Sequence, residues 1–131
     1  MPRGSKPTAS SVAILARSVE TLRALGGYLE GCGLQTAPLR RLDEIGAWRA
    51  QPAAMICFPD EFLDEDFNGS MRSLRQAQPK LLLVMVTRDA ASIADAVAPL
   101  RGSLVPIVMP RPSFGWAIVD VLREHGRACI R

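Results

Sequence analysis

Five short apolar runs recur along the chain, and each is followed by a segment in which apolar residues have helical spacing. The runs cover residues 12–16, 34–39, 53–58, 81–86 and 104–109. A short, nearly continuous apolar run is typical of a strand buried on both faces of a sheet. Alternation of such strands with helices predicts parallel strands joined by right-handed crossovers. The sequence therefore predicts an α/β fold of five β/α units, with helices on both faces of a parallel sheet.

Apolar residues three or four positions apart mark the segments between the runs. The five apolar stripes are Val19, Leu22, Leu25 and Leu29; Leu42, Ile45 and Trp48; Phe67, Met71, Leu74 and Ala77; Ile93, Val97 and Leu100; and Phe114, Ala117, Ile118, Val121 and Leu122. This spacing places each stripe on one side of a helix, where it can pack on the sheet. Ser18 is a candidate cap at the start of the first helix, and Gly31 and Gly33 indicate its end.

Two prolines within the runs bear on the position of their strands in the sheet. Pro38 weakens the second predicted strand, and Pro106 removes a backbone donor from the fifth. A strand that lacks a donor is tolerated where no neighbour needs it. We therefore expect the fifth strand at an edge of the sheet.

The length of 131 residues fits one domain with one core. We expect this domain to span residues 11–126, between a flexible tail at 1–10 and an extension or linker at 127–131. The longest apolar run is much shorter than the roughly 20 residues that cross a bilayer. Three scattered cysteines favour a reducing compartment. These features predict a cytoplasmic location without membrane contact.

Charge and residue types argue against several classes of function. The chain carries 16 basic and 13 acidic side chains, and five of the acids lie within residues 60–66. The basic residues are scattered and no aromatic residues alternate with them, which is not typical of a nucleic-acid surface. His125 is the only histidine, and the cysteines lack the spacing of a metal site. We expect no nucleic-acid binding, no metal, no cofactor and no catalytic residue.

The order and lengths of these units, with the segment YLEGCGL at residues 28–34, resemble the receiver domain of bacterial two-component response regulators. The resemblance covers about residues 11–126. It implies a flavodoxin-like three-layer sandwich whose sheet has the strand order 2-1-3-4-5. This order places the fifth strand at an edge, as Pro106 also indicates.

In that family an acidic pair after the first strand holds Mg²⁺, and an Asp at the end of the third strand accepts the phosphoryl group. In this sequence the acidic pair falls on Ala16 and Arg17, neither of which can bind a metal. The end of the third strand falls on Phe58 or Pro59, with Asp60 one or two positions later. The resemblance therefore implies that the metal site is lost and that Asp60 accepts phosphate only if the strand slips.

The family also uses a Thr or Ser after the fourth strand and a Lys before a Pro after the fifth, both of which contact phosphoryl oxygens. Thr87 matches the hydroxyl position, although it is equally consistent with an ordinary strand end. The lysine position falls on Met109 or Arg111, each followed by a proline. The lysine is therefore lost, and the chain resembles a degenerate receiver, or pseudo-receiver.

For such a domain the resemblance implies phosphorylation-independent signalling through protein contacts. One alternative is a residual receiver that is phosphorylated on Asp60. A second is a sensor of a nucleotide or another anion, bound by Arg17, Arg88 and Arg111 at the carboxyl ends of the strands, where open parallel sheets bind ligands. All three readings stay open on the sequence.

The family's common partner surface lies on the fourth helix, fifth strand and fifth helix. The residues expected on or near this surface are Pro106, Arg111, Phe114, Trp116, Val119 and Arg123. Trp116 and Val119 flank the apolar stripe of the last helix, and an exposed Trp beside an Arg is typical of an interface. The partner is then another protein or a second copy of the chain; alternatively, Trp116 covers the edge of the core.

Three further patterns are weaker. Arg17 is expected either to pair with Asp60 or Asp64, replacing the charge of the metal, or to point to solvent. The acids at residues 60–66 lack the spacing of a calcium loop and are expected to form a solvated loop before a helix. Residues 40–43 have the RxxD form seen in some cyclic dinucleotide sites, a pattern that arises often by chance.

Overall fold

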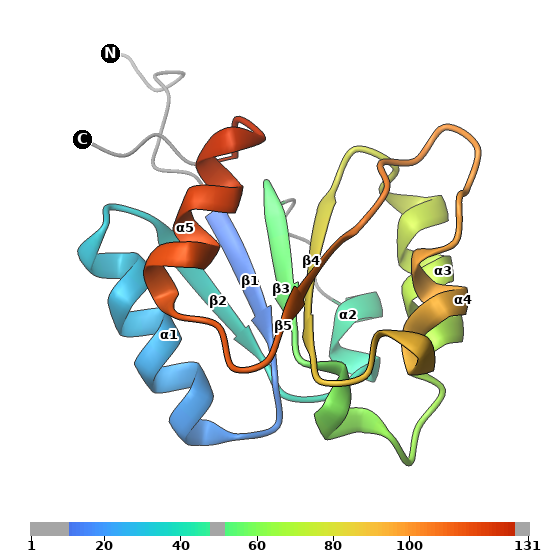
Figure 1. Cartoon of the computed structure of the whole chain (residues 1–131), viewed down its shortest axis with the longest axis horizontal. Helices are drawn as coiled ribbons and strands as arrows, with labels where there is room; N and C mark the ends of the chain where they lie inside the picture. The colour runs from blue at the N-terminus through green and yellow to red at the C-terminus, as the bar shows by residue number, and fades with distance from the viewer. Residues whose placement is uncertain (1–10, 48–51, 128–131) are drawn as a thin grey trace.

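The structure is a computed structural model of the chain, and it describes residues 11–47 and 52–127 (Figure 1). One parallel sheet contains β1 (Ser11–Leu15), β2 (Gln35–Leu39), β3 (Ala54–Cys57), β4 (Leu82–Thr87) and β5 (Ile107–Pro110). Its strand order is β2-β1-β3-β4-β5. The predicted α/β fold, its five units and its flavodoxin-like strand order are confirmed. The predicted tail at residues 1–10, Trp48 and residues 128–131 lie outside the described residues.

Helices cover both faces of the sheet (Figure 1). One face carries α1 (Val19–Gly31) and α5 (Gly115–Glu124). The other face carries α2 (Asp43–Ala47), α3 (Phe67–Ala77) and α4 (Ala94–Val97), with the single turns η1 (Pro59–Phe62) and η2 (Ala90–Ile93). None of the described helices is long and apolar enough to cross a membrane.

Alternate residues of each central strand enter two separate cores. Val12 and Ile14 of β1 pack with Leu25 and Ile118 from the helices of the first face. Ala13 and Leu15 pack on the opposite side, among the residues that contact α3. Because both faces are covered, β1, β3 and β4 need apolar residues at nearly every position. This requirement explains the continuous runs in the sequence.

The start and end of α1 follow the sequence signals. The Oγ of Ser18 accepts a hydrogen bond from the backbone N–H of Thr21 at 3.2 Å, which makes Ser18 the N-cap. The helix ends at Gly31, and Gly33 has a φ of +93°, a conformation that favours glycine. Both predictions for this helix are confirmed.

Each open edge of the sheet has a proline that faces outward. The N–H of Arg111 donates to Thr87 of β4 and the carbonyl of Leu39 accepts from Ala16 of β1, so these two positions face into the sheet. Since neighbouring positions of a strand face opposite sides, Pro110 of β5 and Pro38 of β2 face the open edges. Neither edge therefore offers a full row of N–H donors to an added strand.

The structure corrects the predicted fifth strand. β5 begins at Ile107, so Pro106 precedes the strand, and its side chain is buried. The edge position of β5 is confirmed. Pro106 cannot contribute to an exposed interaction face, because its ring is covered.

The last two predicted helices are shorter than expected or shifted. α4 is a single turn that ends at Val97, so Leu100 is outside it.

Phe114 precedes α5 as its N-cap residue and is 71% exposed, so it does not belong to the apolar stripe. Val119 is 4% exposed and packs in the core. The apolar side of α5 is broader than the predicted stripe, and it includes Val119 because a helix packed on a sheet buries more than one row of side chains.

Candidate functional site

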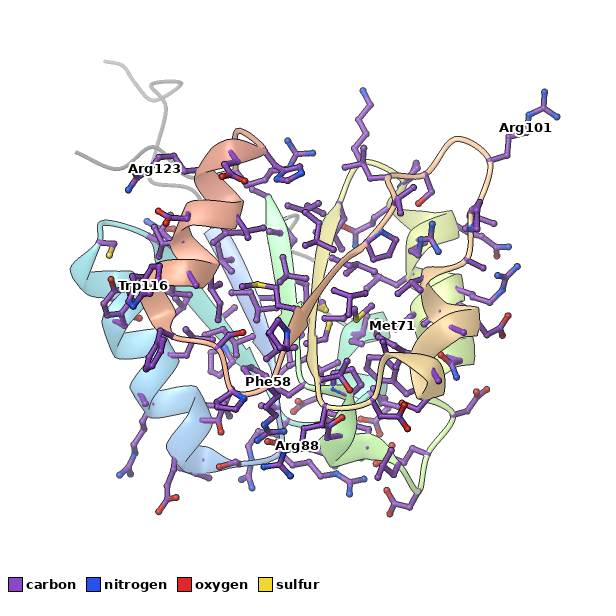
Figure 2. The ribbon with its side chains drawn as sticks, viewed as in Figure 1. Phe58, Met71, Arg88, Arg101, Trp116 and Arg123 are labelled. Atoms are coloured by element: carbon purple, nitrogen blue, oxygen red, sulfur yellow. The ribbon has the colours of Figure 1, made fainter. Side chains whose placement is uncertain are left out.

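Asp60 lies in η1, the turn that follows β3. Figure 2 shows Phe58 and Arg88, which follow β3 and β4, at the carboxyl end of the sheet. The Oδ1 of Asp60 accepts a hydrogen bond from the Oγ1 of Thr87 at 2.5 Å, and its Oδ2 accepts one from the backbone N–H of Arg88 at 3.0 Å. A guanidinium nitrogen of Arg111 lies 4.0 Å from the same Oδ2. Both carboxylate oxygens of Asp60 therefore accept hydrogen bonds from the end of β4, and Arg111 adds a long ion pair.

Glu61, the next residue of η1, connects the loop after β1 to the loop after β5. Its Oε1 accepts from the backbone N–H groups of Arg17 (2.6 Å) and Ser18 (2.9 Å). Its Oε2 accepts from the guanidinium of Arg111 at 2.8 Å. The Glu61 side chain is only 14% exposed. It is therefore a largely buried anion with three donors, the environment that a buried carboxylate requires.

Arg111 is one of the two residues expected at the lysine position of the receiver family. Met109 is buried inside β5, whereas Arg111 directly follows the strand and reaches the two carboxylates of η1. Its guanidinium carbon also lies 5.3 Å from the centre of the Phe58 ring, a cation–π contact. Of the two candidates for the lysine position, the structure favours Arg111.

Phe58 directly follows β3, at the position expected for the phosphoryl acceptor. β3 ends at Cys57 and has not slipped toward Asp60. Phe58 is 7% exposed, so an apolar ring fills this position, and Pro59 starts η1. Ala16 at the acidic-pair position is fully buried. Within residues 11–47 and 52–127, no three His, Cys, Asp or Glu side chains are grouped closely enough to hold a metal ion.

Arg17 pairs with the acids of the loop before α3 and not with Asp60. One guanidinium nitrogen lies 3.2 Å from Asp64, another contacts Glu65, and the guanidinium covers the face of the Phe62 ring at 5.1 Å. The expected pairing with Asp64 is present. The alternative pairing with Asp60 is wrong, because the Arg17 guanidinium is engaged by Asp64 and Glu65 and the cation near Asp60 is Arg111.

These contacts predict weak coupling for Arg17. The Arg17 and Asp64 side chains are 42% and 73% exposed, so we expect their double-mutant coupling energy to stay below about 1 kcal/mol. The effects of Arg17→Ala and Asp60→Ala on the free energy of urea unfolding should add within about 0.5 kcal/mol, since the two side chains do not touch. A larger interaction energy between Arg17 and Asp60 would contradict this arrangement.

The acids of residues 60–66 are not one uniformly solvated loop. Asp60 and Glu61 turn into the polar network, while Asp64 and Glu65 pair with Arg17. Asp66 is the N-cap of α3 and accepts from the N–H of Gly69 at 3.0 Å. The expectation of acids before a helix start is confirmed for Asp66 only.

The expected anion crevice is neutralised by the chain itself. Arg17 and Arg111 both pair with carboxylates, and the backbone of Arg88 binds Asp60. In the RxxD segment, the Arg40 guanidinium donates to the carbonyl of Arg17 at 3.1 Å, and Arg41 pairs with Asp43. These contacts occupy the guanidinium groups of Arg17 and Arg111, whereas Arg88 contributes only its backbone N–H.

The predicted interaction face is only partly exposed. Pro106 and Val119 are buried, as noted above. Trp116 is 58% exposed and stacks on Phe114, with ring centres 6.0 Å apart and planes within 9°. Figure 2 shows Trp116 beside α1 and Arg123 near the other end of α5. The exposed part of the face therefore consists of the stacked pair Phe114 and Trp116 at the start of α5 and of Arg123 near its end.

Arg75 of α3 is a buried charge that the sequence interpretation missed. It is 1% exposed, and its guanidinium donates to the carbonyls of Ala96 (2.8 Å), Ala98 (2.7 Å) and Leu104 (3.2 Å). Burial, with the nearby positive charge of Arg72, lowers the pKa of Arg75. One signal was available: Arg75 lies four positions after Met71, at the edge of the apolar side of α3.

Glu61 was missed as a site residue because five acids lie within residues 60–66, and the sequence does not show which of them turns inward.

Cys57 is fully buried, and burial raises the pKa of its thiol, so it is a poor nucleophile. His125 caps the end of α5, and its ring Nδ1 lies 3.0 Å from the carbonyl of Val121. Neither residue approaches the network around Asp60 and Glu61 by any described contact.

Solved structures of receiver domains have the same fold. A response regulator receiver domain protein (CheY-like) from Methanospirillum hungatei JF-1 matches with a TM-score of 0.76 and 15% identity, over 90% of this chain and 94% of that chain. The signal receiver domain of an HD domain-containing protein from Pseudomonas fluorescens Pf-5 matches with a TM-score of 0.73 and 14% identity, over 92% and 89%. A response regulator from Thermotoga maritima gives 0.70 and 15%, over 88% and 96%.

No protein-family model matches the chain, and no curated protein matches it in sequence. At these low identities the likeness shows the fold: the chain has the flavodoxin-like fold of CheY-like receiver domains. A fold alone does not establish a function, so the function has to be inferred from the residues at the carboxyl end of the sheet.

Proposed function

We propose that this chain is a pseudo-receiver, a non-catalytic signalling domain of a bacterial regulatory system in the cytoplasm that acts through protein contacts without phosphorylation. One observation carries the proposal. The donors at the carboxyl end of the sheet already bind the chain's own carboxylates, Asp60 and Glu61. A phosphoryl group would have to displace these carboxylates to reach the same donors.

The position after β3 supports the same conclusion. A receiver needs a nucleophilic carboxylate there and a metal ion that offsets the charge of the incoming phosphate. This chain has the ring of Phe58 at that position and the buried methyl of Ala16 at the acidic-pair position. The cation near Asp60 is the guanidinium of Arg111, and the carboxylate of Glu61 neutralises its charge.

The runner-up function is a residual receiver that is phosphorylated on Asp60. The hydrogen bond from Thr87 to Asp60 favours it, because a hydroxyl in this place would also contact a phosphoryl oxygen. Against it, both oxygens of Asp60 are occupied and the side chain is only 18% exposed. Nucleophilic attack on a phosphodonor requires an accessible oxygen, so the pseudo-receiver is the better supported function.

We expect acetyl phosphate with Mg²⁺ to leave the intact mass of the chain unchanged, and beryllofluoride to leave its melting temperature unchanged. The reason is that Asp60 lacks both an open oxygen and a metal site beside it. Intact-mass spectrometry and thermal unfolding measure these two outcomes.

Two variants are matched controls for this experiment. Asp60→Asn removes the candidate acceptor, and Asp64→Asn removes a carboxylate of the same region that is 73% exposed. A Mg²⁺-dependent phosphoryl adduct that persists in Asp64→Asn and disappears in Asp60→Asn would overturn the proposed function and establish the residual receiver.

A further inference from the structure

A hollow of about 360 Å³ lies between α1, the start of α5 and the carboxyl ends of β3 and β4. Figure 1 shows α1 and α5 side by side over this face of the sheet. The strand ends supply two apolar lining residues that belong to the core of this face, Phe58 and Val86. Phe58 is 7% exposed and Val86 is fully buried. The hollow therefore reaches from the surface down to the core.

Small side chains leave this space open. Thr21 and Ala24 line the hollow from α1, and Ser113 and Gly115 line it from the start of α5. A Cβ on Gly115 would lie 2.7 Å from the ring of Tyr28, so a larger residue there would displace this ring. Glycine therefore lets the Tyr28 ring stay close to the start of α5, as part of the lining.

The charge beside the hollow is already balanced. Among the described residues that line it, Arg111 is the only charged one. The Arg111 guanidinium lies 2.8 Å from the carboxylate of Glu61 and 4.0 Å from that of Asp60, so two negative charges accompany one positive charge. An anion placed in the hollow would meet the repulsion of both carboxylates. The hollow therefore favours an uncharged ligand.

We propose that this hollow binds an uncharged aromatic molecule of two fused rings. An apolar cavity of about 150 Å³ holds a benzene ring, so a hollow of about 360 Å³ has room for two. The rings of Phe58 and Tyr28 line it, and edge-to-face or offset contacts with them stabilise an aromatic ligand beyond simple burial. The hydroxyl groups of Thr21 and Tyr28 can hydrogen-bond to one polar substituent. A mostly apolar lining with a few polar groups is typical of a small-molecule site.

Two probes of nearly the same shape test the ligand class: 2-naphthamide, which is neutral, and 2-naphthoate, which is an anion at neutral pH. An NMR titration of the ¹⁵N-labelled full chain should give a dissociation constant on the order of 100 μM for 2-naphthamide. The largest shifts should occur at the backbone amides of Thr21, Ser113 and Gly115. We expect 2-naphthoate to bind about 10-fold more weakly, because the carboxylates beside Arg111 repel it.

A substitution inside the hollow tests the location of the site. Ala24 is an exposed residue of α1 that lines the hollow, so Ala24→Phe places a ring where the probe would lie. This variant should weaken the binding of 2-naphthamide by about 10-fold or more. Ala94→Phe is the matched control, because it adds the same ring at an exposed position of α4 on the other face of the sheet. The control should bind as the wild-type chain does, and circular dichroism checks that both variants are folded.

A second substitution tests the role of charge. Glu61→Gln keeps the shape of the side chain but removes the charge nearest to Arg111. The guanidinium is then only partly neutralised, by the more distant Asp60. We expect the preference for 2-naphthamide over 2-naphthoate to shrink in this variant, while 2-naphthamide itself still binds.

Three results would overturn the site: a wild-type chain that does not bind 2-naphthamide, an Ala24→Phe variant that binds it as the wild-type chain does, or tighter binding of 2-naphthoate than of 2-naphthamide. Shifts centred on Arg88 in place of Ser113 and Gly115 would also overturn it. This inference goes beyond the proposed function, and none of these results bears on phosphorylation. Conversely, an Asp60-dependent phosphoryl adduct overturns the proposed function but not the ligand site, because Asp60 does not line the hollow.

Discussion

Replacement of Arg75 by methionine should lower the free energy of unfolding by about 3 kcal/mol, the largest effect that we predict for a single side chain. The guanidinium binds three backbone carbonyls between Ala96 and Leu104, and it also lies 3.3 Å from the Oγ of Ser103. Methionine fills much of the same space but donates no hydrogen bond. The carbonyls are then left without their donors, which is most costly at Ala96, whose hydrogen bond is buried.

The neighbouring Arg72 is the matched control for Arg75. It also lies on α3, but its side chain is 36% exposed and its ion pair with Asp95 is long, at 3.9 Å. We expect Arg72→Met to change the free energy of unfolding by no more than about 0.5 kcal/mol. Arg75→Lys should fall between the two, because one ammonium group cannot reach carbonyls on several sides. Urea unfolding measures all three, and equal losses for Arg72→Met and Arg75→Met would contradict the structural role of Arg75.

The chain from Ala96 to Leu104 depends on this arginine for a specific reason. α4 is a single turn, and the segment that follows it has no regular structure before β5. Such a segment satisfies few of its own backbone carbonyls, so another element must supply the remaining donors. Hydrogen exchange in this segment should therefore rise in Arg75→Met before the rest of the chain is affected.

Replacement of Glu61 by alanine should lower the free energy of unfolding by about 2–3 kcal/mol, the second largest effect that we predict. The substitution removes the acceptor of two backbone N–H groups and of the Arg111 guanidinium. It also leaves Arg111, which is 22% exposed, with only the more distant carboxylate of Asp60. A partly buried cation that loses its partner is destabilising, because the remaining charge is poorly solvated.

A double-mutant cycle of Glu61→Ala and Arg111→Ala should give a coupling energy of about 1–2 kcal/mol in urea unfolding. Asp64→Ala is the control for an exposed acid of the same stretch, and it should cost less than about 1 kcal/mol. If Glu61→Ala costs no more than Asp64→Ala, the carboxylate of Glu61 is not held by the donors that the structure assigns to it.

These two residues also bear on the proposed function. Glu61 fixes the loops after β1 and β5, and Asp60 fixes the end of β4, so the carboxyl end of the sheet is held in one arrangement by the chain's own charges. A domain of this kind has no need of a phosphoryl group to set these loops. Its signalling would then depend on which protein it contacts.

The order of the elements could be predicted from the sequence because it depends on local patterns. Apolar runs that are buried on both faces, a serine before a helix and a glycine after it leave a signal within a few residues. The edge position of β5 was inferred from Pro106 and from the strand order of the receiver family, although Pro106 itself lies outside the strand. The residue types after the first apolar run, Ala16 and Arg17, could also be read directly.

Only the tertiary structure decided which charges are buried and which aromatic residues are exposed. Arg75 and Arg72 belong to the same helix, yet Arg75 is covered by a distant segment and Arg72 faces water. In the same way, Glu61 is largely covered, while Asp64 of the same acidic stretch faces water. Phe114 shares the spacing of the apolar stripe but lies before the first turn of α5. The sequence determined the fold because strand and helix periodicities are local; the site depended on which distant segments cover each side chain, and burial of that kind has no local signal.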